Sequence, residues 1–179
     1  MLATFVMAQY RKFKRKGRFR SNFELKVSKQ IVEAGAQWKY EWKKFVYYQV
    51  QRNIVICENC GPVKALVRRE YLPDFFLSNG VVIEAKGRFT SEDRAKLIAV
   101  KKYHPDLDLR VFFQYNGKLR KTSEDRYMDW ANKNGFPAAV GVIPKEWFLH
   151  ADQKWPRNWQ AKYGGLGEVL PPKKVTRRI

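Results

Sequence analysis

The sequence is poor in cysteine and histidine, and it has no long hydrophobic run. No segment approaches the ~18 consecutive apolar residues that a membrane-spanning helix needs, so we expect no membrane partner. The apolar start at residues 1–9 is followed by basic residues, which reverses the order of a secretory signal. Two cysteines without such a signal fit a reducing compartment, so we expect a cytoplasmic protein. The two histidines, His104 and His150, are too far apart to suggest a site.

Acidic residues are scarce relative to basic ones. The chain of 179 residues has 17 Asp and Glu against 36 Lys and Arg, a net charge of +19. This excess favours a polyanionic partner, with nucleic acid as the first candidate and a membrane surface as the second. A basic N-terminal arm at residues 1–20 and a basic C-terminal extension at 151–179 carry much of it. The arm is either a solvated tail or, as its interleaved Tyr and Phe favour, a DNA-binding segment that uses Arg15, Lys16, Arg18 and Arg20.

Hydrophobic periodicity predicts a single domain at residues 21–150. Ser21 and Glu24 have the spacing of a capping box, and Gly35 is expected to end the helix that follows, at about 22–34. A long aromatic strand is expected at 38–50. The stretch 51–70 is the least legible part, with a returning strand expected at 63–72.

The second half of this domain alternates helices and strands. The expected elements are a helix capped by Ser91 that ends near Tyr103, a buried strand at 109–114, a helix from Ser123 to Asn134 that stops at Gly135, a strand at 138–143 and a turn opened by Pro144. This order predicts an α/β fold with a mixed central sheet flanked by helices.

The most informative motif is Asp74 followed ten residues later by Glu84 and then by Lys86. The stretch between the acids has Asn79-Gly80 between apolar runs, which is typical of a hairpin turn. The hairpin should fold Asp74 back toward Glu84 at the rim of a small sheet. Because side chains alternate along a strand, Glu84 and Lys86 should share one face.

These residue types suit phosphodiester hydrolysis. A cation neutralises developing charge and lowers the pKa of water, and Mg²⁺ prefers a few carboxylate oxygens together with water and phosphate. Asp74, Glu84 and the carbonyl of Ala85 are the candidate ligands, and Lys86 could orient the attacking water or stabilise the transition state. The plainer interpretation is a surface hairpin on which Glu84 and Lys86 form an ordinary ion pair.

Short motifs between about residue 18 and residue 150 match one known family in the same order. They are Phe19-Arg20-Ser21 through Glu24, Lys26-Val27-Ser28-Lys29-Gln30, Pro73-Asp74-Phe75, Asn79-Gly80, Glu84-Ala85-Lys86-Gly87, Asp93-Arg94, His104-Pro105 through Leu107-Asp108, and Ile143-Pro144 through Glu146-Trp147. On these residues the chain resembles the phage endonuclease I family, the four-way (Holliday) junction resolving enzymes of T-odd phages within the PD-(D/E)xK nucleases.

The resemblance implies a nuclease domain at 21–150 with a restriction-endonuclease-like core, located in the host-cell cytoplasm. Its catalytic residues would be Glu24, Asp74, Glu84 and Lys86, with two Mg²⁺ or Mn²⁺ ions per site. Glu24 would help to hold the second metal or to position water. Alternatively, Glu24 serves only as the N3 residue of the capping box.

The resemblance also implies an intertwined homodimer. Strands would exchange so that Glu24 comes from one chain and the other three residues from its partner, with 38–50 as the bridge. The stretch 51–70 is an insertion relative to the family pattern. It contains Cys57 and Cys60. Zinc normally takes four ligands, which only two copies of the chain could supply, so we expect two free cysteines or an adventitious disulfide in preference to a zinc site. The family pattern also begins near Met7, which we expect to be the native start.

The function implied is a structure-selective endodeoxyribonuclease that resolves four-way junctions and other branched DNA. The alternatives are a less selective nuclease that nicks or degrades host DNA and a non-catalytic DNA-binding protein. No base-reading module is evident, so selectivity should come from DNA shape and phosphate contacts. Candidate cations for these contacts are Lys26, Lys29, Arg88, Arg94, Lys96, Lys101, Lys102, Lys118, Arg120 and Lys121.

Overall fold

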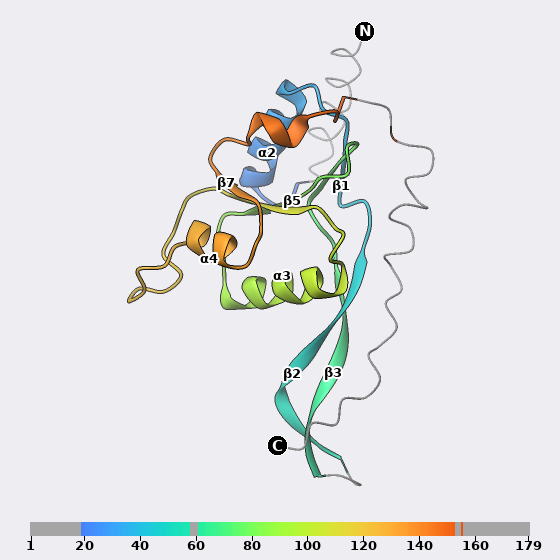
Figure 1. Cartoon of the computed structure of the whole chain (residues 1–179), viewed down its shortest axis with the longest axis vertical. Helices are drawn as coiled ribbons and strands as arrows, with labels where there is room; N and C mark the ends of the chain where they lie inside the picture. Colours follow the sequence, from blue (N-terminus) through green and yellow to red (C-terminus); the bar gives the residue numbers. More distant parts are fainter. Residues whose placement is uncertain (1–18, 58–60, 153–154, 156–179) are drawn as a thin grey trace.

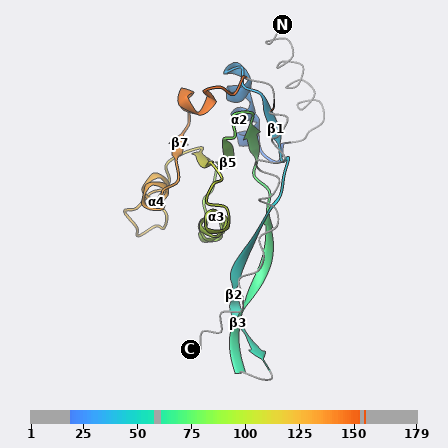
Figure 2. The same ribbon diagram turned by 45° about the vertical axis from the view of Figure 1, so that its right-hand side comes forward.

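A five-stranded mixed sheet forms the centre of the protein (Figures 1 and 2). The structure is a computed structural model that describes residues 19–57, 61–152 and 155, and for residues 51–57 and 62–65 it describes the backbone only. The strand order is β1 (Trp38–Tyr40), β4 (Phe75–Leu77), β5 (Val82–Lys86), β6 (Leu109–Phe113) and β7 (Ala138–Val140). The first three strands pair antiparallel and the last three pair parallel, which confirms the predicted mixed α/β sheet.

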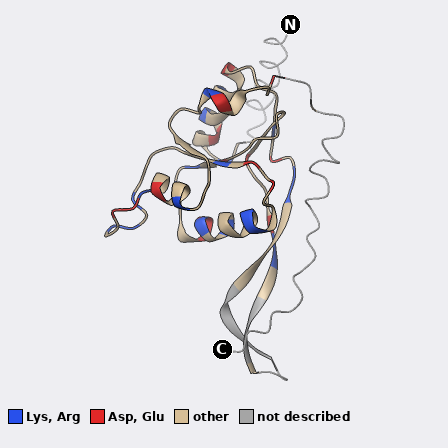
Figure 3. Cartoon of the chain, in the orientation of Figure 1, with Lys and Arg blue, Asp and Glu red and all other residues tan. Residues whose placement is uncertain are grey.

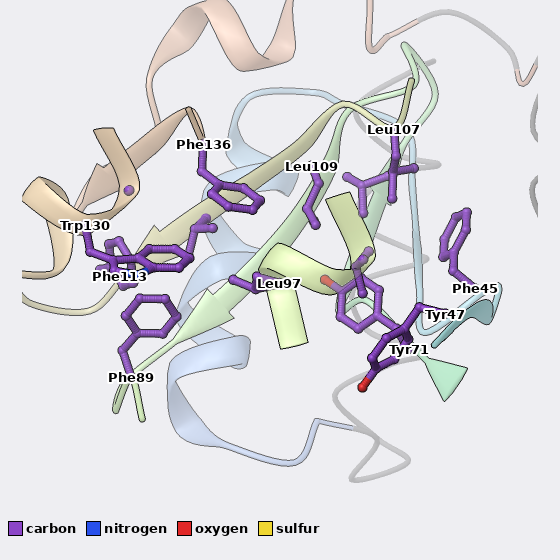
Figure 4. Close-up of a cluster of buried hydrophobic side chains, with 14 of the residues drawn as sticks. Phe45, Tyr47, Tyr71, Phe89, Leu97, Leu107, Leu109, Phe113, Trp130 and Phe136 are labelled. Carbon is purple, nitrogen blue, oxygen red and sulfur yellow. The ribbon is translucent and has the colours of Figure 1, made fainter. Parts of the chain in front are cut away.

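Helices cover both faces of this sheet. On one face lie α2 (Asn22–Glu33) and the short 3-10 helix η1 (Lys145–Phe148), and on the other lie α3 (Ser91–Tyr103) and α4 (Tyr127–Lys133) (Figure 1). Successive side chains of β5 point to opposite faces of the sheet and so enter two hydrophobic cores. Ile83 packs in the core under α2, and Val82 packs in the core under α3. The second core is rich in aromatic rings and continues to Tyr71 (Figure 4).

The position of β5 corrects the expectation of a site at the rim of a small sheet. β5 is the middle strand of the five, with neighbours on both sides and helices on both faces. A charged side chain on this strand is therefore surrounded by protein, and Glu84 is only 2% exposed. The alternation itself is as predicted, since Glu84 and Lys86 form an ion pair on the face toward α3.

The single strand predicted at 38–50 is two strands in the structure. Glu41 has a positive φ of 44°, and the chain leaves the sheet there. It then forms a separate two-stranded ribbon of β2 (Phe45–Cys57) and β3 (Gly61–Tyr71), which extends away from the sheet (Figure 2). The stretch 51–70, expected as an insertion of uncertain structure, thus makes up most of this ribbon.

A buried histidine attaches the base of the ribbon to α3. His104 caps the end of α3 through its backbone N–H to Val100, as expected from its place before Pro105. Its ring Nε2 donates a hydrogen bond to the carbonyl oxygen of Val46 on β2, at 2.7 Å. Burial lowers the pKa of His104, which keeps the ring neutral in this contact.

Two predicted helix starts shift by one or more residues. Thr90, not Ser91, caps α3, because Thr90 and Asp93 form a reciprocal capping box. The helix expected from Ser123 begins only at Tyr127, and Ser123 instead accepts a hydrogen bond from the backbone of Asp125 within a loop. Among the helices that the structure describes, none has the length and apolar character to cross a bilayer.

Candidate active site

The hairpin between β4 and β5 brings Asp74 against Glu84. Gly80 takes a positive φ of 96° in the turn, a conformation that a residue with a Cβ adopts only under strain. Asn79 does not have a positive φ. The side chain of Asn79 instead donates hydrogen bonds to the carbonyls of Trp147 and Leu149 and so ties the turn to the segment around η1. Asp74 directly precedes β4, and its Oδ2 accepts a hydrogen bond of 2.8 Å from the backbone N–H of Ala85.

Glu84 is a buried carboxylate with three donors around it. Its Oε2 accepts a hydrogen bond of 2.7 Å from the hydroxyl of Tyr71, at the end of β3. Its Oε1 lies 2.8 Å from the Nζ of Lys86 and 3.4 Å from the Nζ of Lys96 on α3. The negative charge is therefore matched by two ammonium groups, which a nearly fully buried carboxylate requires.

Glu24 lies near the site, in the first turn of α2. Ser21 Oγ accepts a hydrogen bond from the backbone N–H of Glu24, as the capping box predicts. The Glu24 carboxylate does not close the box on Ser21 N–H. It accepts instead from Arg20 N–H at 2.9 Å and from the hydroxyls of Ser21 at 2.9 Å and Tyr40 at 2.5 Å. Glu24 thus both caps the helix and lies within electrostatic range of Asp74.

The charges of these residues perturb one another. Burial and the neighbouring charge of Glu84 hold the pKa of Asp74 well above its usual range, with a further contribution from Glu24; the Ala85 N–H and Lys86 act in the opposite direction. Burial alone would lower the pKa of Lys86, but Glu84 and Asp93 outweigh it and raise that pKa above its ordinary value. Lys86 therefore stays protonated at neutral pH, while Asp74 experiences strong repulsion.

The carboxylates fit a divalent cation that takes its remaining ligands from outside the protein. Repulsion between Asp74 and Glu84 is what a bound cation would relieve. In the part of the chain that is described, no three His, Cys, Asp or Glu side chains form a group that could hold a metal by themselves. Mg²⁺ is commonly bound in this manner, through one or two carboxylates with water and substrate phosphate completing its shell.

Of the predicted DNA-binding residues that the structure describes, Lys96 contacts the cluster, with its Nζ 3.4 Å from Glu84 Oε1. Arg15, Lys16 and Arg18 fall outside the described residues, as does Cys60. The side chain of Cys57 is also not described. Arg20 is largely exposed and pairs with Glu41 at 2.6 Å. The side chains of Lys26, Lys29 and Arg88 are exposed, whereas Arg94 is half-buried and donates to the carbonyl of Phe89.

Sequence reasoning missed three residues of the site: Tyr71, Tyr40 and Asp93. It named Lys96 as a candidate DNA contact but did not place it next to Glu84. The two tyrosines each donate to one of the predicted catalytic carboxylates. Asp93 lies 3.2 Å from Lys86 and also caps α3. Only the tertiary fold brings these side chains together, although Tyr71 just before the Pro73-Asp74 pair and the matched Asp93-Arg94 motif were available signals.

The fold and the site thus define a mixed α/β protein in which Asp74, Glu84 and a protonated lysine lie together and Glu24 lies within electrostatic range of Asp74. A family model described as phage endonuclease I matches residues 6–164. Endonuclease I of Escherichia phage T7 is 34% identical over 150 residues, which are 83% of this chain and 91% of that protein. Endodeoxyribonuclease 1 of Enterobacteria phage T3 is 39% identical over 127 residues, 70% of this chain and 74% of that one. The chain belongs to the phage endonuclease I family, which confirms the resemblance seen in its motifs.

Proposed function

We propose that this protein is a structure-selective endodeoxyribonuclease that resolves four-way junctions and other branched DNA by metal-dependent phosphodiester hydrolysis. The observation that carries the proposal is that Asp74, Glu84 and Lys86 lie together, with Glu24 within electrostatic range of Asp74. Both relatives named above are endonucleases by name. A protein that only bound DNA would gain nothing from three carboxylates placed where phosphate must approach, since they repel it.

Lys86 is the central catalytic group of this chain. Its ammonium lies between Glu84 Oε1 at 2.8 Å and Asp93 Oδ1 at 3.2 Å, and its raised pKa keeps it charged. A protonated lysine cannot remove a proton from water. Lys86 therefore acts as a donor that orients the attacking water or stabilises the charge that develops on the phosphate oxygens.

Asp74 and Glu84 would hold the divalent cation, with the carbonyl of Ala85 as a further ligand and Glu24 toward a second ion. The Ala85 N–H fixes one oxygen of Asp74, and Tyr71 fixes one oxygen of Glu84. When bound, the cation would lower the pKa of a water and neutralise charge on the phosphate. The surrounding core limits how far these carboxylates can move.

Exposed cations around the site would position the DNA by its phosphates. Basic residues occur along α3, and one of them, Lys96, lies against Glu84 (Figure 3). Contacts of this kind give affinity without reading sequence, so the shape of a branched substrate would determine selectivity. We expect binding affinity to fall steeply with salt, with a slope of about −0.9 per neutralised phosphate, and a flat dependence would count against this surface.

The test compares cleavage of a fixed four-way junction with that of a linear duplex built from the same arms, in Mg²⁺, with Glu84→Ala as the control. Paired symmetric cuts near the branch point, absent in the variant, would support the proposal. Equal cutting of both substrates would instead indicate a less selective nuclease. Tight binding without cutting would leave a DNA-binding protein and overturn the catalytic assignment.

We also propose that the protein works as a strand-exchanged homodimer, as the resemblance implies. A four-way junction has approximate two-fold symmetry, and a two-fold dimer presents two sites to opposed strands. In the single chain, α2 packs on the sheet of the same chain. In an exchanged dimer, α2 of the second copy would take that place and make the same local contacts.

Mixing a Glu24→Ala chain with a Lys86→Ala chain tests the exchange. In an exchanged heterodimer one site combines the intact Glu24 of one chain with the intact Asp74, Glu84 and Lys86 of the other, so activity returns. In a dimer whose sites each come from one chain, every site carries a substitution. Verified heterodimers that stay inactive would therefore exclude exchange.

A further inference from the structure

Two lysines, not one, reach the buried carboxylate at the centre of the site. Lys86 on β5 lies 2.8 Å from Glu84 Oε1 and 3.2 Å from Asp93 Oδ1. Lys96 on α3 approaches the same two oxygens, at 3.4 Å and 3.9 Å. Its Nζ also lies 5.2 Å from the centre of the Tyr71 ring, over its face. Lys96 is thus part of the network around Glu84 and does not extend into solvent.

The contacts of Lys96 are the weakest in this network. Lys86 is closer to both acids, and Tyr71 holds the other oxygen of Glu84 at 2.7 Å. The side chain of Lys96 is also the more exposed of the two lysines, 27% against 17%. An ammonium group has three donors, and the hydrogen bond from Lys96 to Glu84 Oε1 is long, at 3.4 Å. It can therefore turn toward a new anion without leaving Glu84 unpaired.

We propose that Lys96 is a second catalytic lysine, which binds a non-bridging oxygen of the scissile phosphate while Lys86 remains paired with Glu84. This inference rests on the proposed function. A phosphodiester that approaches Glu84 and Lys86 must come within reach of the ammonium group that shares Glu84 Oε1 with Lys86. The contact stabilises the negative charge that grows on the phosphate during attack. No bond to Lys96 forms or breaks, and the lysine keeps its proton.

A purely structural role predicts different behaviour. If Lys96 serves only to offset the charge of Glu84, its loss should lower stability and leave the cleavage of bound DNA almost unchanged, because Lys86 still pairs with Glu84. Lys145 supplies a matched control. It lies in η1 on the opposite face of the sheet, is exposed, and carries the same charge.

The test is single-turnover cleavage of the junction at saturating protein by Lys96→Met, Lys96→Arg and Lys145→Met. Each Met substitution removes one positive charge. Cleavage by Lys96→Met should be slower by roughly 10- to 100-fold, that by Lys96→Arg should recover in part, and that by Lys145→Met should stay within about twofold of wild type. Equal rates for Lys96→Met and Lys145→Met would overturn the inference.

A second measurement changes the DNA and so does not depend on the folding of a variant. A neutral methylphosphonate replaces the phosphate at the mapped cut position, and junction affinity is measured in EDTA for wild type and for Lys96→Gln. If Lys96 contacts that phosphate, the methylphosphonate should weaken binding of wild type more than binding of Lys96→Gln. Equal effects would count against the contact. Failure of wild type to cut any DNA would overturn the proposed function itself, which is a different result from normal cutting by Lys96→Met.

Discussion

Glu24 and Glu84 bring carboxylates to the same site from two regions that stabilise negative charge differently. Glu84 lies on the central strand, surrounded by one ammonium group from the same strand, one from α3 and a tyrosine from β3. Glu24 lies at a helix start, where its donors are the neutral Arg20 N–H and the hydroxyls of Ser21 and Tyr40. Two of these three donors lie within four residues of it in the sequence.

The difference concerns how each charge is supported. The cations around Glu84, Lys86 and Lys96, are also the proposed catalytic lysines, so the same side chains stabilise the buried charge and take part in the reaction. The donors around Glu24 would serve equally well in an ordinary helix cap, where a carboxylate is favoured near the positive end of the helix dipole. The fold should therefore tolerate loss of the Glu24 charge much better than loss of the Glu84 charge.

The largest expected effect separates the two acids by isosteric substitution. Glu84→Gln would place an amide against Lys86 and Lys96, and cleavage of the junction should fall by roughly a thousandfold or more. Glu24→Gln can keep its carbonyl oxygen toward Arg20 N–H and Tyr40, so only the charge is lost. Its cleavage rate should fall by about 10- to 100-fold, with little change in melting temperature.

Glu33→Gln, at the exposed end of α2, is the control for this pair, and its cleavage rate should match that of wild type. Single-turnover rates on the same junction provide the measurement. If Glu24→Gln were as active as the control, Glu24 would be a helix cap and nothing more. If it were as damaged as Glu84→Gln, the proposed difference between the two regions would be wrong.

The two tyrosines should show the same contrast on a smaller scale. Tyr71→Phe removes a donor from a fully buried carboxylate and should lower the free energy of unfolding by about 2 kcal/mol. Tyr40 is only half-buried, and Glu24 keeps its hydrogen bond from Arg20, so Tyr40→Phe should cost about 1 kcal/mol. Urea unfolding of both variants measures this, with Tyr103→Phe, whose ring lies against Tyr48, as a near-neutral control. Equal losses for Tyr71→Phe and Tyr40→Phe would contradict the contrast.

Local sequence patterns predicted the hairpin that carries Asp74 and Glu84. Its turn and its alternation depend on neighbouring residues, and the structure has both, with Gly80 at the positive φ and the Glu84–Lys86 pair on one face. Helix α2 and its end at Gly35, where φ is 72°, were predictable for the same reason.

Features that depend on distant packing were not predictable in this way. Burial of Glu84 follows from the central place of β5, which only the crossover to β6 creates. The end of β1 at Glu41 follows from a positive φ in a residue type that rarely adopts it, and the Glu41 N–H then bonds the carbonyl of Asp74. Tyr71 and Lys96 meet Glu84 because the ribbon base and α3 converge on one face of the sheet, a contact that the sequence of either segment alone does not indicate.

The last expected effect is a change in the pH dependence of stability at Asp74, which forms no ion pair among the described residues, unlike Glu84. Its pKa in the folded protein is raised, so between the unfolded value of about 3.9 and the folded value the native state binds more protons than the unfolded state. Stability from this group is therefore full below about pH 3.9 and is lost as pH rises through the folded pKa. Asp74→Asn keeps an oxygen for the Ala85 N–H without the charge. In EDTA at pH 7 it should raise the free energy of unfolding by about 1 kcal/mol or more, while it abolishes cleavage.

The gain from Asp74→Asn should shrink as the pH falls toward 4, because wild-type Asp74 is then protonated and resembles the amide. Melting curves of both proteins from pH 4 to pH 8 measure the difference directly. A gain that did not change with pH would mean that repulsion among the carboxylates is not its cause. A clear loss of stability at neutral pH would show that the fold depends on the Asp74 carboxylate, and Asp74 would then resemble Glu84, whose charge the fold is expected to need, and not Glu24.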